Sequence, residues 1–192
     1  MKEKLTLRNV IIWSAAFLGL LIFCLSFAGG ARMSYTEGNH SLLYKFTNAI
    51  WSCSHVNVYD NGSLMASGDI AGKPFILPIL GIVLVLVAAI GAVLISFLLK
   101  NEKLAKILLI VAGVLSIVGG VFVFFTGESV IRSFVYEMTG NLDQLEAYKA
   151  EFKSAGGKWG PGALTVILGI LAIVAGGLNI VAPFLPEKKL AK

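Results

Sequence analysis

The chain has 192 residues, of which 57% are hydrophobic and 14% are charged. Soluble domains usually carry about 25% charged residues, so this composition excludes an ordinary soluble domain and is typical of a protein with several membrane spans. The formal net charge is +5. The basic residues flank apolar runs, so we attribute them to membrane topology and anionic lipid headgroups and predict no nucleic-acid partner.

Four apolar stretches are long enough to cross a roughly 30 Å hydrocarbon core as helices. They cover about residues 10–28, 75–99, 104–125 and 162–185. The first stretch could instead be a secretory signal peptide, because small residues follow it, but its apolar run exceeds the roughly 7–15 residues usual for a signal peptide. We therefore predict a retained first helix. The fold class is an all-α integral membrane protein, a four-transmembrane-helix bundle that forms a single membrane domain over residues 1–192.

Basic residues predict the orientation of these spans. A short turn with Lys100, Lys103 and Lys106 joins the second and third spans, and the two chain ends are also short and basic. Together these segments hold nine of the sixteen Lys and Arg residues, whereas loops 29–73 and 126–161 hold eight of the eleven acids. By the positive-inside rule, both termini are cytoplasmic and both long loops are extracytoplasmic, and we expect a multi-pass protein of the cell (plasma) membrane.

The first long loop contains a predicted β-hairpin. Residues 54–59 alternate between polar and apolar side chains, as in a half-buried strand. Asn61-Gly62 then gives a strong tight-turn signal, because both residues tolerate positive φ, and residues 64–66 return as the second strand. Asn39 and Asn61 also begin formal glycosylation sequons. We expect this loop to form a small cap on the membrane surface.

The second long loop shows two amphipathic helical stripes. Gly140 is placed as the C-cap of the first helix, and Asn141 with Gln144 has the spacing of a capping box that opens the second. The stripes either pack onto the rest of the protein or form a groove for a partner. Their apolar members are Val130, Ile131, Phe134, Val135 and Met138, then Leu142, Leu145, Tyr148 and Phe152.

The spans carry small and polar residues but no Asp, Glu, Lys, Arg or His near their centres. Ionisable residues inside the membrane usually mark proton relays and ion pathways, so their absence argues against a pump or a coupled transporter. Asn179 is the only amide in the spans, and we expect it to form an interhelical hydrogen bond. Small residues four apart favour close helix packing, either within one bundle or, at Gly176 and Gly177, with a second protein. The predicted packing positions are Gly19, Ala92, Gly120, Gly176 and Asn179.

The polar residues of the first loop do not form a recognisable catalytic or metal motif. His40 and His55 lie far apart in sequence among scattered acids, and Cys24 and Cys53 are poorly placed to pair. No serine-hydrolase or metalloprotease motif occurs. We therefore predict no catalytic residue, no metal, no cofactor and no disulfide framework.

The segment Ala49-Ile50-Trp51-Ser52-Cys53 resembles a degenerate form of the first-loop motif of the claudin and peripheral-myelin-protein tetraspan superfamily. Trp51 matches that family's tryptophan and Cys53 its first cysteine. The second cysteine is absent, the motif's glycine is alanine, and the second loop is longer. The resemblance covers the topology of the whole chain and about five motif residues. It implies a left-handed four-helix bundle capped by a small outer sheet, and work in adhesion, lateral assembly or as an accessory subunit.

Our main hypothesis is a non-enzymatic four-span membrane protein that binds other proteins, or itself, through its outer loops and helix faces. A small transporter or channel component that works as an oligomer or with partner subunits is the alternative. An interfacial membrane enzyme is the least favoured of the three. Besides membrane lipids, a protein partner or self-association is expected. The candidate interaction residues are Trp51, Tyr59, Phe134, Tyr148, Phe152 and Trp159.

Overall fold

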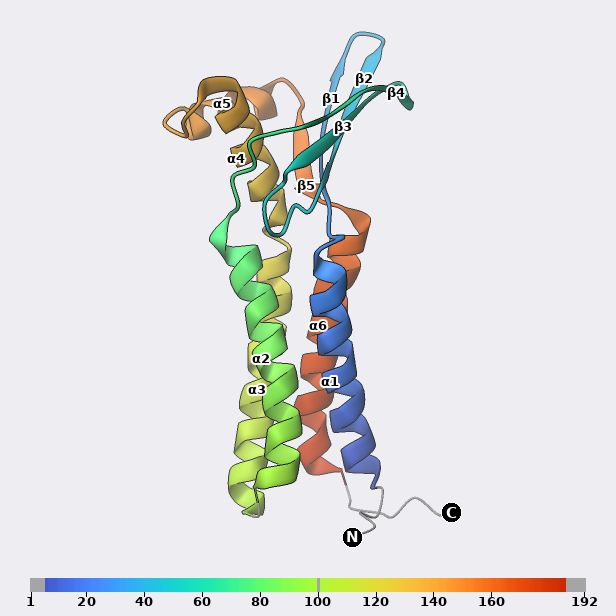
Figure 1. Cartoon of the computed structure of the whole chain (residues 1–192), viewed down its shortest axis with the longest axis vertical. Helices are drawn as coiled ribbons and strands as arrows, with labels where there is room; N and C mark the ends of the chain where they lie inside the picture. The colour runs from blue at the N-terminus through green and yellow to red at the C-terminus, as the bar shows by residue number, and fades with distance from the viewer. Residues whose placement is uncertain (1–5, 100, 186–192) are drawn as a thin grey trace. The chain divides into compact units, whose positions relative to one another are not determined.

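The computed structural model of the chain describes residues 6–99 and 101–185 and is mostly helical. It contains the four predicted apolar helices, each long and apolar enough to cross a membrane. They are α1 (Leu7–Ser26), α2 (Ile76–Leu98), α3 (Glu102–Val123) and α6 (Ala163–Val181), and a short 3-10 turn over Ala182–Phe184 follows the last (Figure 1). Several of the predicted inner charges, at Lys2, Lys4, Lys100, Lys188, Lys189 and Lys192, lie outside the described residues.

The chain divides into two compact units. The helix unit consists of Met1–Cys24, Leu80–Val121 and Leu168–Lys192. The sheet unit consists of Leu25–Ile79 and Phe122–Ile167, which are the two long loops with the adjoining ends of the apolar helices.

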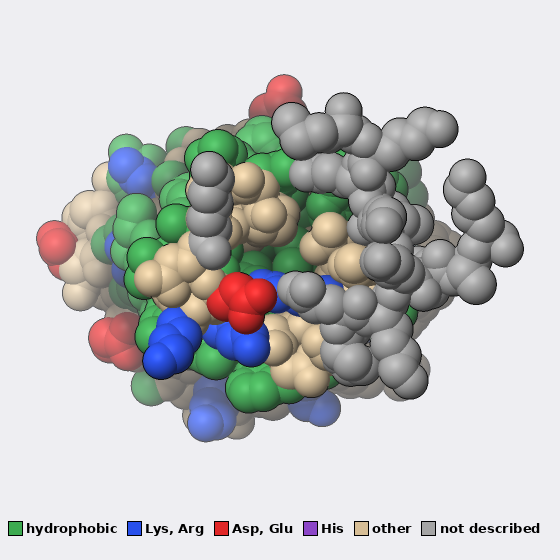
Figure 2. All heavy atoms as spheres, turned by 90° about the horizontal axis from the view of Figure 1, so that it is seen from below, with side chains coloured by type: hydrophobic (Ala, Val, Ile, Leu, Met, Phe, Trp, Pro, Cys, Tyr) green, Lys and Arg blue, Asp and Glu red, His purple; other side chains and the backbone are tan. Residues whose placement is uncertain are grey.

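Within the helix unit, α1 begins and α6 ends at the end where α2 meets α3 (Figure 1). Figure 2 looks onto this end, where charged side chains collect within a largely hydrophobic surround. The charged residues of the described helix ends there are Arg8, Glu102, Lys103 and Lys106. An apolar shaft with charges at its end is the pattern that a helix bundle in lipid requires.

Small residues allow α3 and α6 to approach closely. A Cβ added to Gly176 would lie 2.5 Å from the carbonyl oxygen of Gly113, and one added to Gly113 would lie 2.6 Å from that of Gly176. A Cβ on Gly120 would similarly meet the Gly169 carbonyl oxygen at 2.7 Å. Gly177, in contrast, has open space where its Cβ would be, so it has no packing role within the unit.

Two further predicted packing positions lie on α1 and α2. A Cβ on Gly19 would lie 2.5 Å from the Cβ of Ala89, and Ala92 is fully buried. Asn179 is 1% exposed, but its side-chain oxygen has no hydrogen-bond partner among the described residues, so the predicted interhelical hydrogen bond is not found at this atom. Ser116 makes such a bond instead, donating to the Ala172 carbonyl oxygen at 2.8 Å.

The sheet unit contains a five-stranded antiparallel sheet in the order β4-β3-β2-β1-β5. The first loop supplies four strands and the second loop supplies β5, which pairs with β1 from Ala31↔Pro161 to Ser34↔Lys158. The strands are β1 (Ala31–Glu37), β2 (His40–Thr47), β3 (His55–Asp60), β4 (Ser63–Asp69) and β5 (Lys158–Pro161).

The predicted hairpin is confirmed as β3 and β4, joined at Asn61-Gly62 with φ of 49° and 86°. The prediction underestimated the β-structure, however, because it contained one hairpin and the structure contains a five-stranded sheet. A second hairpin joins β1 to β2 through Gly38, whose φ is 56°. Asn61 links the two hairpin tips, since its side chain donates to the Asn39 carbonyl oxygen and accepts from the Ser41 amide.

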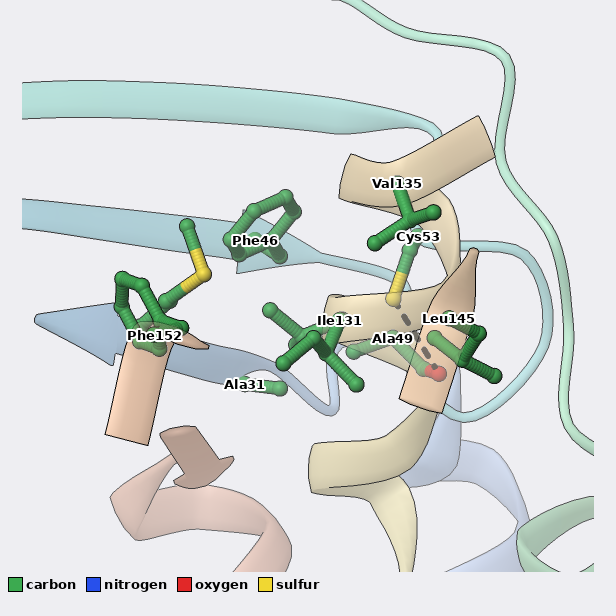
Figure 3. Close-up of a cluster of buried hydrophobic side chains, with 10 residues drawn as sticks. Ala31, Phe46, Ala49, Cys53, Ile131, Val135, Leu145 and Phe152 are labelled. Carbon is green, nitrogen blue, oxygen red and sulfur yellow. Dashed lines mark hydrogen bonds between the residues drawn. The ribbon is translucent and has the colours of Figure 1, made fainter. Parts of the chain in front are cut away.

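One face of the sheet is apolar and is covered by helices α4 (Thr126–Thr139) and α5 (Leu145–Ser154). Cross-strand pairing places Met33 beside Tyr44 and Phe46 beside Val56 on this face. The two predicted helices of the second loop are thereby confirmed. Figure 3 shows the core they form with the strands, which contains Ala31, Phe46, Ala49, Cys53, Ile131, Val135, Leu145 and Phe152.

The ends of α4 and α5 match the predictions only in part. Gly140 is the left-handed C-cap of α4, with φ of 72°, as predicted. The capping box is wrong, because α5 starts at Leu145 and Gln144 is its N-cap, without a side-chain hydrogen bond. The Asn141 side chain accepts a hydrogen bond from the Asp143 amide instead. Such a bond to the backbone two residues on forms a turn, and it competes with helix initiation.

Three side chains on one face of α4 hold the segment that leads from β4 to α2. Ser129, Ser133 and Glu137 recur every four residues and therefore lie on one face of the helix. They accept hydrogen bonds from the backbone amides of Phe75, Lys73 and Ala71 at 3.3, 2.8 and 2.8 Å. This α4 ladder satisfies backbone donors that belong to neither the sheet nor a helix.

Candidate functional site

The structure separates the six predicted interaction residues into three places. Trp51 packs against the C-terminal end of α1. Its indole N–H donates to the Ser26 hydroxyl at 3.0 Å, and its ring stacks on Phe27 with 5.1 Å between the ring centres. Tyr59 lies on the polar face of the sheet, where the Lys45 ammonium sits 4.4 Å from its ring centre. The other four form a continuous row in which neighbouring ring centres are 5.8–6.1 Å apart: Phe134, Tyr148, Phe152 and Trp159.

An open cleft of about 330 Å³ lies between the members of this row on α4 and α5 and the strands β1 and β2. Strand pairing sets Met33 beside Tyr44 and Tyr35 beside Leu42, which places all four on the helix-covered face. We call this the aromatic cleft. Its lining residues are Met33, Tyr35, Leu42, Tyr44, Phe134, Tyr148, Glu151, Phe152 and Ala155.

Five aromatic rings form an arc around the aromatic cleft. Tyr44 packs edge-on against Phe134, and Tyr148 lies nearly parallel to Phe152, with an angle of 13° between the rings. The centroid distances along the arc are 5.5 Å for Tyr44–Phe134, 5.8 Å for Phe134–Tyr148, 5.9 Å for Tyr148–Phe152 and 6.0 Å for Phe152–Tyr35. Ring pairs at this spacing stabilise one another and hold the arc in place.

The lining of the aromatic cleft contains one charged residue, Glu151. Burial, the nearby Tyr44 and the Glu151 carboxylate together raise the pKa of the Tyr148 hydroxyl. Of the residues that line the cleft, Glu151 is acidic and none is Lys or Arg. The neighbouring Lys149 is held by Glu128 at 2.6 Å and by Glu146 at 3.0 Å. Burial lowers the pKa of Lys149, but these carboxylates outweigh that effect and raise it overall, so its charge is already paired.

The two edges of the sheet differ sharply. Strand β4 is exposed at all seven positions and carries the large apolar side chains of Leu64 and Met65, which are 58% and 67% exposed. An edge strand leaves backbone N–H and C=O groups unpaired, and proteins usually protect such edges with lysine, proline or short length. The opposite edge, β5, has all three, since it is four residues long and contains Lys158 and Pro161. Strand β4 has none of these three features, although its register against β3 shifts between Val58 and Tyr59.

The two histidines of the first loop each pair with an aspartate. His40 Nδ1 lies 2.8 Å from Asp60 and His55 Nδ1 lies 2.7 Å from Asp69. A hydrogen-bond chain continues from His55 Nε2 to Ser67. Within residues 6–99 and 101–185, no group of three or more His, Cys, Asp or Glu side chains could hold a metal ion.

Cys53 lies in the core of the sheet unit. It is fully buried, and its thiol donates to the Ala49 carbonyl oxygen at 3.5 Å (Figure 3). Burial raises its pKa to about 12, despite an opposing hydrogen bond with Ser133. Both cysteines are free, and Cys24 is exposed on α1.

Sequence reasoning identified the helical half of the aromatic cleft and missed the strand half. The available signal was the alternation of Met33 with Tyr35 and of Leu42 with Tyr44, which places each pair on one strand face. Glu151 was not predicted as a site residue, because a charged residue beside an apolar helical stripe is usually part of the solvent-exposed face of the helix.

Comparison with known proteins gives no further lead to a function. No family model matches the sequence, and no curated protein matches it.

Proposed function

We propose that this chain is a plasma-membrane protein with four spans, cytoplasmic termini and an extracytoplasmic sheet unit that binds other proteins. The short basic segments and the acidic long loops support this orientation. A four-helix unit with a small sheet built mostly from the first loop is also what the claudin-like resemblance implies. Its role would then be adhesion, lateral assembly or service as an accessory subunit, without catalysis.

The observation that carries this proposal is the exposed edge strand β4, which contains no lysine and no proline. Its backbone offers a row of hydrogen-bonding groups to a strand of another chain, and Leu64 and Met65 offer apolar contact beside that row. Strand addition of this kind obtains affinity from the main chain and specificity from alternate side chains. The protected opposite edge directs any such pairing to β4.

The test is the double substitution Leu64→Lys and Met65→Lys, with Ala147→Lys and Ala150→Lys together as the control. Ala147 and Ala150 are exposed on α5, so the control adds the same charge to surface positions on another element. Protein extracted in mild detergent is analysed by cross-linking and by light scattering after gel filtration. We expect the wild type and the control to associate with a partner or with themselves, and the double variant to lose that association.

A wild-type protein that is strictly monomeric and has no partner would overturn the proposal. The proposal would also fail if the double variant at Leu64 and Met65 associated as the wild type does, because β4 would then not be the contact.

A further inference from the structure

We propose that the aromatic cleft is a binding site for a small quaternary ammonium group, such as the trimethylammonium of a choline compound. The cleft lies entirely within the sheet unit. The proposal is independent of strand pairing at β4.

The first argument is the lining. Five of the nine lining residues are Tyr or Phe. Aromatic faces carry partial negative charge, and several rings around one site attract a cation that has no N–H groups to hydrogen-bond. Apart from the tyrosine hydroxyls and Glu151, the lining side chains offer no polar group, so they suit a methylated cation better than a primary amine.

The second argument is charge. Glu151 lines the cleft together with Tyr148 and Phe152, so its carboxylate belongs to the same site as these rings. The neighbouring Lys149 is paired with Glu128 and Glu146. A ligand cation therefore meets an unpaired negative charge and no competing positive charge among the lining residues.

The third argument is size and order. The volume of about 330 Å³ is at the lower end of the roughly 300–1,000 Å³ typical of small-ligand sites. The ring contacts from Tyr44 through Phe134, Tyr148 and Phe152 to Tyr35 hold the arc together before any ligand arrives. A preformed site loses little conformational entropy when it binds.

The experiment titrates the purified full chain in a maltoside detergent, which lacks an ammonium group, with tetramethylammonium, choline and the neutral isostere 3,3-dimethylbutan-1-ol. Saturation transfer to the ligand methyl protons reports binding. We expect both cations to bind and the isostere to bind about tenfold more weakly, because it lacks the positive charge that the ring faces attract. Equal affinity for choline and the isostere would overturn the proposal, because the cleft would then be merely apolar. Absence of tetramethylammonium binding would also overturn it.

Variants locate the site. We expect Tyr148→Leu to weaken choline binding about tenfold and Tyr148→Phe to retain it, because the ring and not the hydroxyl makes the contact. Glu151→Gln, at an exposed carboxylate, should weaken binding about threefold without affecting folding. Tyr59→Leu, on the other face of the sheet, is the control and should change nothing. If Tyr59→Leu lowers affinity as much as Tyr148→Leu does, the cation binds elsewhere and the proposal fails.

Glycerophosphocholine distinguishes two sources of the same group. Tighter binding than choline points to a lipid headgroup, and equal or weaker binding points to a free solute. Either result supports the trimethylammonium site itself.

Discussion

Cys53 links burial to the pH dependence of stability. The pKa of the Cys53 thiol is near 9.0 in the unfolded chain, whereas burial raises it to about 12 in the folded protein. Between these values the unfolded chain has released a proton that the folded chain retains, so the free energy of unfolding falls as pH rises through this window.

We therefore expect the stability difference between wild type and Cys53→Ala to shrink above pH 9 by about 1.4 kcal/mol per pH unit. Denaturant unfolding of both proteins in detergent at pH 8, 9.5 and 10.5 measures it. Other titrating groups are common to the two proteins, so they cancel in the comparison. A difference that stays constant with pH would show that this thiol ionises as readily folded as unfolded.

Gly176 and Gly177 are adjacent on α6 but have opposite surroundings. Gly176→Ala would place a Cβ 2.5 Å from the Gly113 carbonyl oxygen, a backbone atom that moves only if the helices separate. We expect a loss of about 1–3 kcal/mol, as for other overpacked sites. Gly177→Ala meets open space and should be neutral or gain up to about 1 kcal/mol from its better helix propensity. Unfolding of the two variants side by side makes the comparison, and equal losses would show that α3 and α6 are not in close contact.

At the scale of elements, the α4 ladder connects α4 to the segment before α2. Ser133→Ala removes the acceptor for the Lys73 amide and should cost about 1–3 kcal/mol, because that donor is left without a partner. Amide hydrogen exchange at Lys73 should accelerate in this variant. Ser154→Ala, at an exposed hydroxyl on α5, is the control and should change stability by less than about 0.5 kcal/mol. Unchanged exchange at Lys73 would rule out the hydrogen bond.

Elements with a strong local signal were predictable. The four apolar helices follow from length and hydrophobicity, the β3–β4 turn from Asn61-Gly62, and the end of α4 from Gly140. The pairing of β5 with β1 was not predictable, because it joins residues from different loops and β5 has only four residues. The aromatic cleft depends on that same assembly of both loops, so the sequence pointed to its helices but not to its strands.

At the scale of the whole molecule, the proposed orientation makes a testable prediction. Asn101→Cys places a thiol in the α2–α3 turn, and Asn39→Cys places one in the β1–β2 turn; both are exposed. With Cys24 replaced by Ser in both, a membrane-impermeant maleimide should label Asn39→Cys on intact cells. It should label Asn101→Cys only after permeabilisation. The opposite pattern would invert the topology.

The β1–β5 pairing also means that the sheet is completed late during synthesis of the chain. Strands β1 to β4 are complete once residue 69 has been synthesised, but β5 follows only after α2, α3, α4 and α5. During that interval β1 is itself an open edge, free to pair with a strand of another chain, and long-range strand pairing is intrinsically slow. The last strand to leave the ribosome therefore closes the sheet, and a chain delayed before residue 158 would present two open edges in place of one.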